Sequence, residues 1–98
     1  MKMAFAEANM EKLHYAVMGR ELVNRKVFTR GEVEVASEKP SFKNALNEIE
    51  KMGIEKFASA VEAMRKNGEP RERSIGEMFA ADPANLVALV SRHGRKSA

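Results

Sequence analysis

The feature that most constrains this chain is the Asp82-Pro83 step, because it separates two short apolar patterns of helical spacing. The residue before a proline disfavours the helical conformation, so a helix beginning near Ser74 must end by Asp82. Ser74 is a favoured N-cap residue, and Glu77 three positions later completes the pattern of a capping box. Asp82 can cap a second helix whose first turn holds Pro83. We therefore predict two helices joined by a tight turn over residues 74–93.

Each of these two segments carries one apolar stripe, and small residues stand where a neighbouring helix must approach closely. This arrangement resembles the helix-turn-helix family of DNA-binding domains. The residues that match the family's pattern are Ile75, Gly76, Phe79, Ala80, Leu86 and Leu89. The alternative is an ordinary helical hairpin that packs two apolar faces and binds no DNA.

The resemblance implies that the segment 83–92 enters the major groove of double-stranded DNA. Its outward face would consist of Ala84, Asn85, Ala88, Ser91 and Arg92. An asparagine can pair with adenine, and alanine methyl groups can contact thymine. The residues that would hold phosphates are Arg71, Arg73, Arg95 and Lys96. A domain of this size commonly binds its operator as a dimer, so the resemblance also implies a two-fold partner.

The distribution of charge agrees with a phosphate-rich partner near the C-terminus. Lys and Arg equal Asp and Glu, ten against ten, up to Met64, and they exceed them by seven to four after it. The whole net charge of +3 therefore lies around the predicted helix pair. Such a basic patch is typical of nucleic-acid binding, although a solvated surface with a basic tail explains the same excess.

Composition argues against several other classes of function. Cysteine is absent, which favours a cytoplasmic location and excludes thiolate metal sites. No apolar run is long enough to span a membrane. The two histidines, His14 and His93, are far apart and match no metal-binding motif, so we expect no metal and no cofactor. No catalytic constellation is present, and we predict that the chain is not an enzyme.

The N-terminal segment 1–20 has the spacing of an amphipathic helix that Gly19 ends or loosens. Its apolar seam contains Met3, Met10, Leu13 and Val17. A spacing near 3.5 residues suits packing on a partner helix, within the fold or across a homodimer. Packing within the fold is the first expectation, and dimerisation is the alternative.

The middle of the chain alternates between two patterns. Residues 22–36 contain Glu32-Val33-Glu34-Val35, whose period of two predicts a β-hairpin of 26–29 with 32–35. The alternative is a short helix from Arg30 to Ala36. Residues 41–67 are helical, with Ser41 as the expected N-cap, and form one kinked helix or, preferably, two helices separated at Gly53.

The sequence thus predicts a single, mostly α domain over residues 1–98, with a short β-hairpin, a C-terminal helix-turn-helix and a flexible basic tail over 94–98. The predicted function is that of a small DNA-binding transcriptional regulator. The alternative is a phage- or plasmid-type accessory protein, either an assembly factor or an inhibitor of a host protein, which acts by protein–protein contact without DNA.

Overall fold

The computed structural model describes residues 2–70 and 74–97, with side-chain surroundings for residues 13–70 and 74–93. The described residues form helices and contain no strand. The helices are α1 (Lys2–Asn24), α2 (Arg30–Ser37), α3 (Phe42–Met52), α4 (Ile54–Lys66), α5 (Ile75–Ala81) and α6 (Pro83–Ser97). The prediction of a mostly α chain is confirmed. None of the helices described is both long and apolar enough to cross a membrane.

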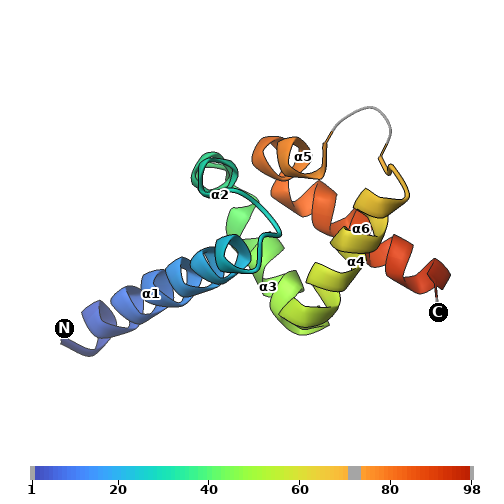
Figure 1. Ribbon diagram of the computed structural model, residues 1–98. Coiled ribbons are helices and arrows are strands. Elements are labelled where there is room, and N and C mark those ends of the chain that lie inside the picture. The colour runs from blue at the N-terminus through green and yellow to red at the C-terminus, as the bar shows by residue number, and fades with distance from the viewer. Residues whose placement is uncertain (1, 71–73, 98) are drawn as a thin grey trace.

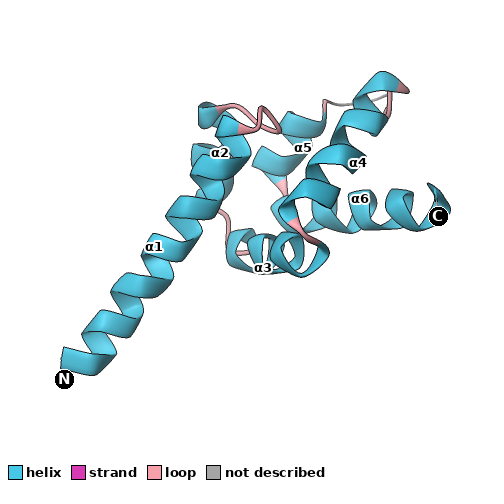
Figure 2. Cartoon of the chain, turned by 60° about the horizontal axis from the view of Figure 1, so that its bottom comes forward, coloured by secondary structure: helices cyan, strands magenta, loops and turns pink. Residues whose placement is uncertain are grey.

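Helix α6 is the centre of the arrangement, because it packs against α3, α4 and α5 (Figure 1). Helix α2 lies on the far side of α5, and α1 joins the body through α2 and α3. Only the C-terminal half of α1 reaches the other helices, and its N-terminal half stands away from them in both views (Figure 2). The molecule is accordingly elongated, with extents of 50 × 27 × 22 Å.

A continuous apolar core joins all six helices through residues from every one of them. Phe28, Phe42, Phe57 and Phe79 meet at its centre, where Phe28 and Phe79 stack with ring centroids 4.0 Å apart. All four phenylalanines are buried and belong to the core. No polar or charged side chain is buried within the part of the chain that the structure describes.

The predicted β-hairpin is wrong. Residues 30–37 form helix α2, which was the alternative, and a complete capping box begins it. Thr29 Oγ1 accepts a hydrogen bond from the backbone N–H of Glu32 at 3.2 Å, and the Glu32 carboxylate accepts from the backbone N–H of Thr29 at 2.8 Å. Two backbone donors at the helix start are thereby satisfied, which outweighs the weak strand preference of an alternating pattern.

Helix α1 does not end at Gly19 but continues to Asn24. Gly19 is buried, and a Cβ atom at this position would lie 3.2 Å from Cγ1 of Val33. The missing side chain lets α2 approach α1 closely, so Gly19 serves helix packing rather than helix termination. A single glycine inside a helix costs only about 1 kcal/mol relative to alanine, which the packing offsets.

The segment 41–67 contains two helices, α3 and α4, with Gly53 between them at φ 99° and ψ 125°. The φ is positive, as is common for a glycine that ends a helix, but this ψ lies outside the left-handed helical region. Ser41 occupies the N-cap position of α3 without a capping hydrogen bond to its backbone. The Ser41 hydroxyl lies 3.5 Å from Oδ1 of Asp82, so it links the start of α3 to the start of α6.

Candidate functional site

The corner between α5 and α6 consists of two helices separated at Asp82. Ser74 Oγ accepts a hydrogen bond from the backbone N–H of Glu77 at 3.1 Å, which caps α5. Asp82 has an extended conformation (φ −150°, ψ 87°) that ends this helix. Its carboxylate then accepts from the backbone N–H of Asn85 at 3.3 Å and caps α6, which begins at Pro83. The connection is thus a single residue, shorter than the three or four typical of a helix-turn-helix.

Between Pro83 and His93, where its side chains are described, helix α6 exposes a narrow row. Asn85, Ala88 and Arg92 are exposed, at spacings of three and four residues, and so lie on one face. Ser91, which was predicted on the same face, is half-buried and lines a groove shared with α3. The rest of the helix is held by its neighbours through Leu86, Val87 and Val90, which are buried.

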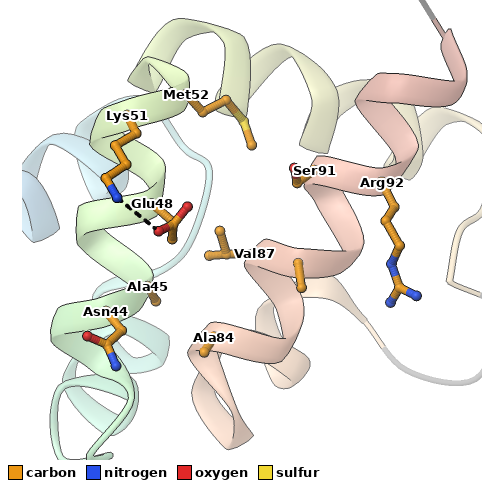
Figure 3. Close-up of a pocket in the computed structure, with 10 residues that line it drawn as sticks. Asn44, Ala45, Glu48, Lys51, Met52, Ala84, Val87, Ser91 and Arg92 are labelled. Atoms are coloured by element: carbon orange, nitrogen blue, oxygen red, sulfur yellow. Dashed lines mark hydrogen bonds and ion pairs between the residues drawn. The ribbon is translucent and has the colours of Figure 1, made fainter.

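The groove between α3 and α6 has a volume of about 560 Å³ and runs beside the exposed row (Figure 3). Its α3 wall carries Glu48 and Lys51, whose charged atoms lie 3.5 Å apart. Val87 of α6 points into the groove, whereas the guanidinium of Arg92 points away from α3. The α3 wall of the groove therefore carries one acid and one cation, and the Arg92 guanidinium lies on the other side of α6.

Of the four residues predicted to contact phosphates, the structure gives the backbone position of two. Arg71 and Arg73 lie outside the described residues. Arg95 and Lys96 lie on the last turns of α6, and the surroundings of their side chains are not described. The sequence predicts a flexible tail from Gly94, and the structure continues α6 as far as Ser97. Basic residues in the last turn favour this extension through the helix dipole, and one glycine costs about 1 kcal/mol.

The predicted seam on α1 is not used inside the fold where the structure describes it. Leu13 is 64% exposed and Val17 is 55% exposed. Met18 and Leu22 face the core instead. Met3 and Met10 lie on the N-terminal half of α1, and their side-chain surroundings are not described. The first expectation, packing of this seam within the fold, is therefore wrong for Leu13 and Val17.

Neither histidine belongs to a cluster that could hold a metal ion, and no such cluster of His, Asp and Glu occurs in the described ranges. His14 Nε2 lies 2.6 Å from a carboxylate oxygen of Glu50 and joins α1 to α3. His93 Nδ1 lies 3.3 Å from the carboxylate of Glu69. Both histidines thus join separate elements of the fold.

A second concave surface was missed by the sequence analysis. A cleft of about 940 Å³ lies between α1, α2 and α3, and its charged residues are Arg20, Arg30, Lys39, Lys43 and a single acid, Glu34. Among the described residues, no carboxylate lies within ion-pair distance of these four cations. The Lys43 ammonium instead lies 5.9 Å from the ring centroid of Tyr15. We refer to this surface as the basic cleft.

The distribution of charge along the sequence does not single out the basic cleft, because its four cations lie within residues 1–64, whose formal charges sum to zero. They are brought together only when α2 folds as a helix against α1. With the geometry of both surfaces established, comparison with known proteins gives no relative: no protein-family model, no curated protein and no solved structure matches this chain.

Proposed function

We propose that this chain is a small DNA-binding regulatory protein that contacts double-stranded DNA through the exposed row of α6. The observation that carries the proposal is that Asn85, Ala88 and Arg92 share one outward face of a helix that three other helices hold in place. A rigid helix that presents a few polar side chains in a row is the common device for reading base edges in the major groove.

The chemistry of this row suits duplex DNA. Asn85 lies in the first turn of α6 and can pair with adenine through its amide, while the Ala88 methyl can contact thymine. Arg92 lies two turns further along and can reach a phosphate or a guanine. The residues proposed to hold flanking phosphates remain Arg71, Arg73, Arg95 and Lys96, and Lys51 on the groove wall adds another cation near the row.

Binding to labelled duplex fragments at two salt concentrations tests the proposal. The wild-type chain should bind, and its affinity should fall steeply with salt because phosphate contacts release counterions. Arg92→Ala should weaken binding and lower the salt slope by about one. Asn85→Ala should weaken binding to the preferred sequence more than to mixed sequence.

The matched control is Lys56→Ala, which removes an equal charge from an exposed position on α4. This variant should bind DNA as the wild type does, apart from a small uniform loss. Equal losses for Arg92→Ala and Lys56→Ala would show that binding depends on overall charge alone. The absence of any shift at micromolar protein would refute the proposal.

A second candidate function is supported by the exposed Leu13 and Val17 on α1. The chain would then be an accessory protein that acts on another protein and does not bind DNA. This alternative predicts a monomer in solution, no duplex binding, and a partner that is lost in Leu13→Asp and retained in Asn85→Ala. Measurements of DNA binding and of partner binding with Leu13→Asp and Asn85→Ala therefore distinguish the two candidate functions.

A further inference from the structure

One side of α1 carries side chains that the other described helices leave uncovered, and this side leads into the basic cleft. At 100° per residue, Leu13, Val17, Arg20 and Asn24 follow one another along the same side of the helix. Leu13 and Val17 are exposed apolar residues, whereas Arg20 and Asn24 line the cleft. The apolar row and the basic cleft therefore form one continuous surface. At 1.5 Å per residue its length along α1 is about 16 Å, which matches roughly three turns of a partner helix.

The positive charge of the cleft comes from four separate segments of the chain. Arg20 lies on α1 and Arg30 begins α2, whereas Lys39 precedes α3 and Lys43 lies on its first turn. Arg20, Arg30 and Lys43 are exposed, and Glu34 is the only acid among the described residues that line the cleft. Because no described carboxylate pairs with these cations, their charge is available to a partner. The surface therefore complements a negatively charged molecule.

Apolar groups in the cleft restrict the class of this molecule. Ala16 is exposed, and Val23 and Val33 are half-buried, so the walls of the cleft offer apolar surface to water. A nucleic-acid backbone would use the cations and leave these groups uncovered, together with Leu13 and Val17. A small anion would cover even less of a surface that reaches from the cleft to Leu13. An acidic protein segment that also carries apolar side chains would use both the charge and the apolar walls.

We propose that the apolar row and the basic cleft together bind an acidic amphipathic helix of a partner protein. A helix satisfies its own backbone hydrogen bonds, whereas an extended segment needs a sheet edge, and the described residues contain no strand. The partner helix buries apolar side chains against Val17 and the cleft walls. It places its carboxylates beside Arg20 and Arg30, since a guanidinium can bind a carboxylate through two N–H groups. This binding does not require that α6 binds DNA, because no residue of α6 lines the cleft.

Selection of binders to the full chain from a phage library tests the proposal. The library displays randomised positions on one face of a stable helical scaffold, so that acidic, basic and neutral helices compete equally. The selected helices should carry acids beside an apolar stripe. Val17→Asp should weaken binding of the purified scaffolds by about 10-fold or more, because it places an acid in an apolar contact with an acidic partner. The control is Val35→Asp on α2, an exposed apolar residue outside the row and the cleft, which should bind as the wild type does.

Charge reversal in the cleft provides the decisive arm of the test. Arg20→Glu with Lys43→Glu should weaken binding of the selected scaffolds by about 10-fold or more, since repulsion replaces attraction at two positions. The matched control is Lys56→Glu with Lys66→Glu on α4, which changes the net charge equally at exposed positions outside the cleft and should cost about threefold or less. A scaffold whose acids are changed to lysine should bind the reversed chain more tightly than the wild type. Circular dichroism checks that all variants keep their helices.

Selection of helices without an excess of acids, or of acidic helices that tolerate the reversal at Arg20 and Lys43, overturns the proposal. Two further results would assign the surface to another occupant and would also overturn it. One is a dimer of the chain alone, seen in sedimentation equilibrium, that Val17→Asp dissociates. The other is binding to a labelled duplex that the reversal at Arg20 and Lys43 abolishes and Arg92→Ala retains. The purified scaffolds are measured without nucleic acid, so failure of DNA binding by α6 leaves this result unaffected.

Discussion

Gly76 of α5 lies directly against the carboxylate of Glu32 in α2, so that a Cβ atom at position 76 would overlap the carboxylate oxygens. The carboxylate cannot move away freely, because it accepts a hydrogen bond from the backbone N–H of Thr29 at 2.8 Å. The close approach of α2 to α5 therefore depends on a missing side chain on one helix and on a capping box on the other.

Gly76→Ala should destabilise the fold by about 1–3 kcal/mol, because it either breaks the capping box or separates α2 from α5. Urea unfolding measures the change. Helix propensity alone predicts the opposite sign, a gain of up to about 1 kcal/mol for alanine. The control is Gly31→Ala, where a Cβ atom would meet no neighbour, and this variant should be neutral or more stable than the wild type.

The same contact can be tested by a double-mutant cycle with Glu32→Ala. This substitution alone should cost about 1 kcal/mol through loss of the cap. In its background, Gly76→Ala should become nearly neutral, because no carboxylate remains to be displaced. Additive effects of the two substitutions would contradict the proposed contact.

Gly53 provides a prediction that depends on the backbone alone. Its φ of 99° with ψ of 125° is a conformation that other residues rarely adopt, and a Cβ atom there would touch nothing. Gly53→Ala should therefore cost about 1–3 kcal/mol in urea or thermal unfolding. Gly53→Asn should cost about as much, since asparagine tolerates the left-handed helical region and this ψ lies outside it. Unchanged stability in either variant would contradict the observed break between α3 and α4.

The stacked pair of Phe28 and Phe79 joins the α1–α2 connection to α5. The two rings have an interplanar angle of 6°, and Phe28 is only 3% exposed. Phe28→Leu keeps most of the apolar volume and should cost about 1–2 kcal/mol, whereas Phe28→Ala also leaves a cavity and should cost about 3–5 kcal/mol. The difference between the two variants in chemical denaturation measures the cavity. Equal losses of stability in the two variants would show that Phe28 stabilises the core through the contacts of its aromatic ring and not through its volume.

Helices α3 to α6 could be predicted because their ends carry strong local signals. Gly53, Ser74 and the Asp82-Pro83 step each fix a boundary through backbone chemistry that acts over a few residues. Helix α2 carries an equally local signal, Thr29 three positions before Glu32, but the alternation of Glu and Val over residues 32–35 favours a strand. The prediction failed because α2 is short and its register is set by packing on α5, with Ala36 buried and Val35 exposed.

The candidate functional surfaces could be predicted from the sequence less well than the helices. The exposure of Asn85 and Arg92 follows from helical periodicity once the buried stripe of α6 is known. The basic cleft does not follow from any pattern, because Arg20, Arg30 and Lys43 belong to three different helices. Their approach depends on the close packing of α1 and α2 at Gly19, a residue predicted to end or loosen the first helix.

The carboxylate of Glu48 lies on the wall of the groove beside the exposed row of α6, where it would face DNA phosphates. If α6 enters the major groove, this acid opposes binding, and Glu48→Gln should strengthen it by about 2–10-fold at low salt. Part of the gain comes from release of Lys51, whose ammonium lies 3.5 Å from the Glu48 carboxylate. Fluorescence anisotropy with a labelled duplex measures the change, and Glu62→Gln on α4, which releases Lys66 in the same way, is the matched control. An equal gain in the control would assign the effect to net charge, and a loss of affinity in Glu48→Gln would exclude this face of α6 from the interface.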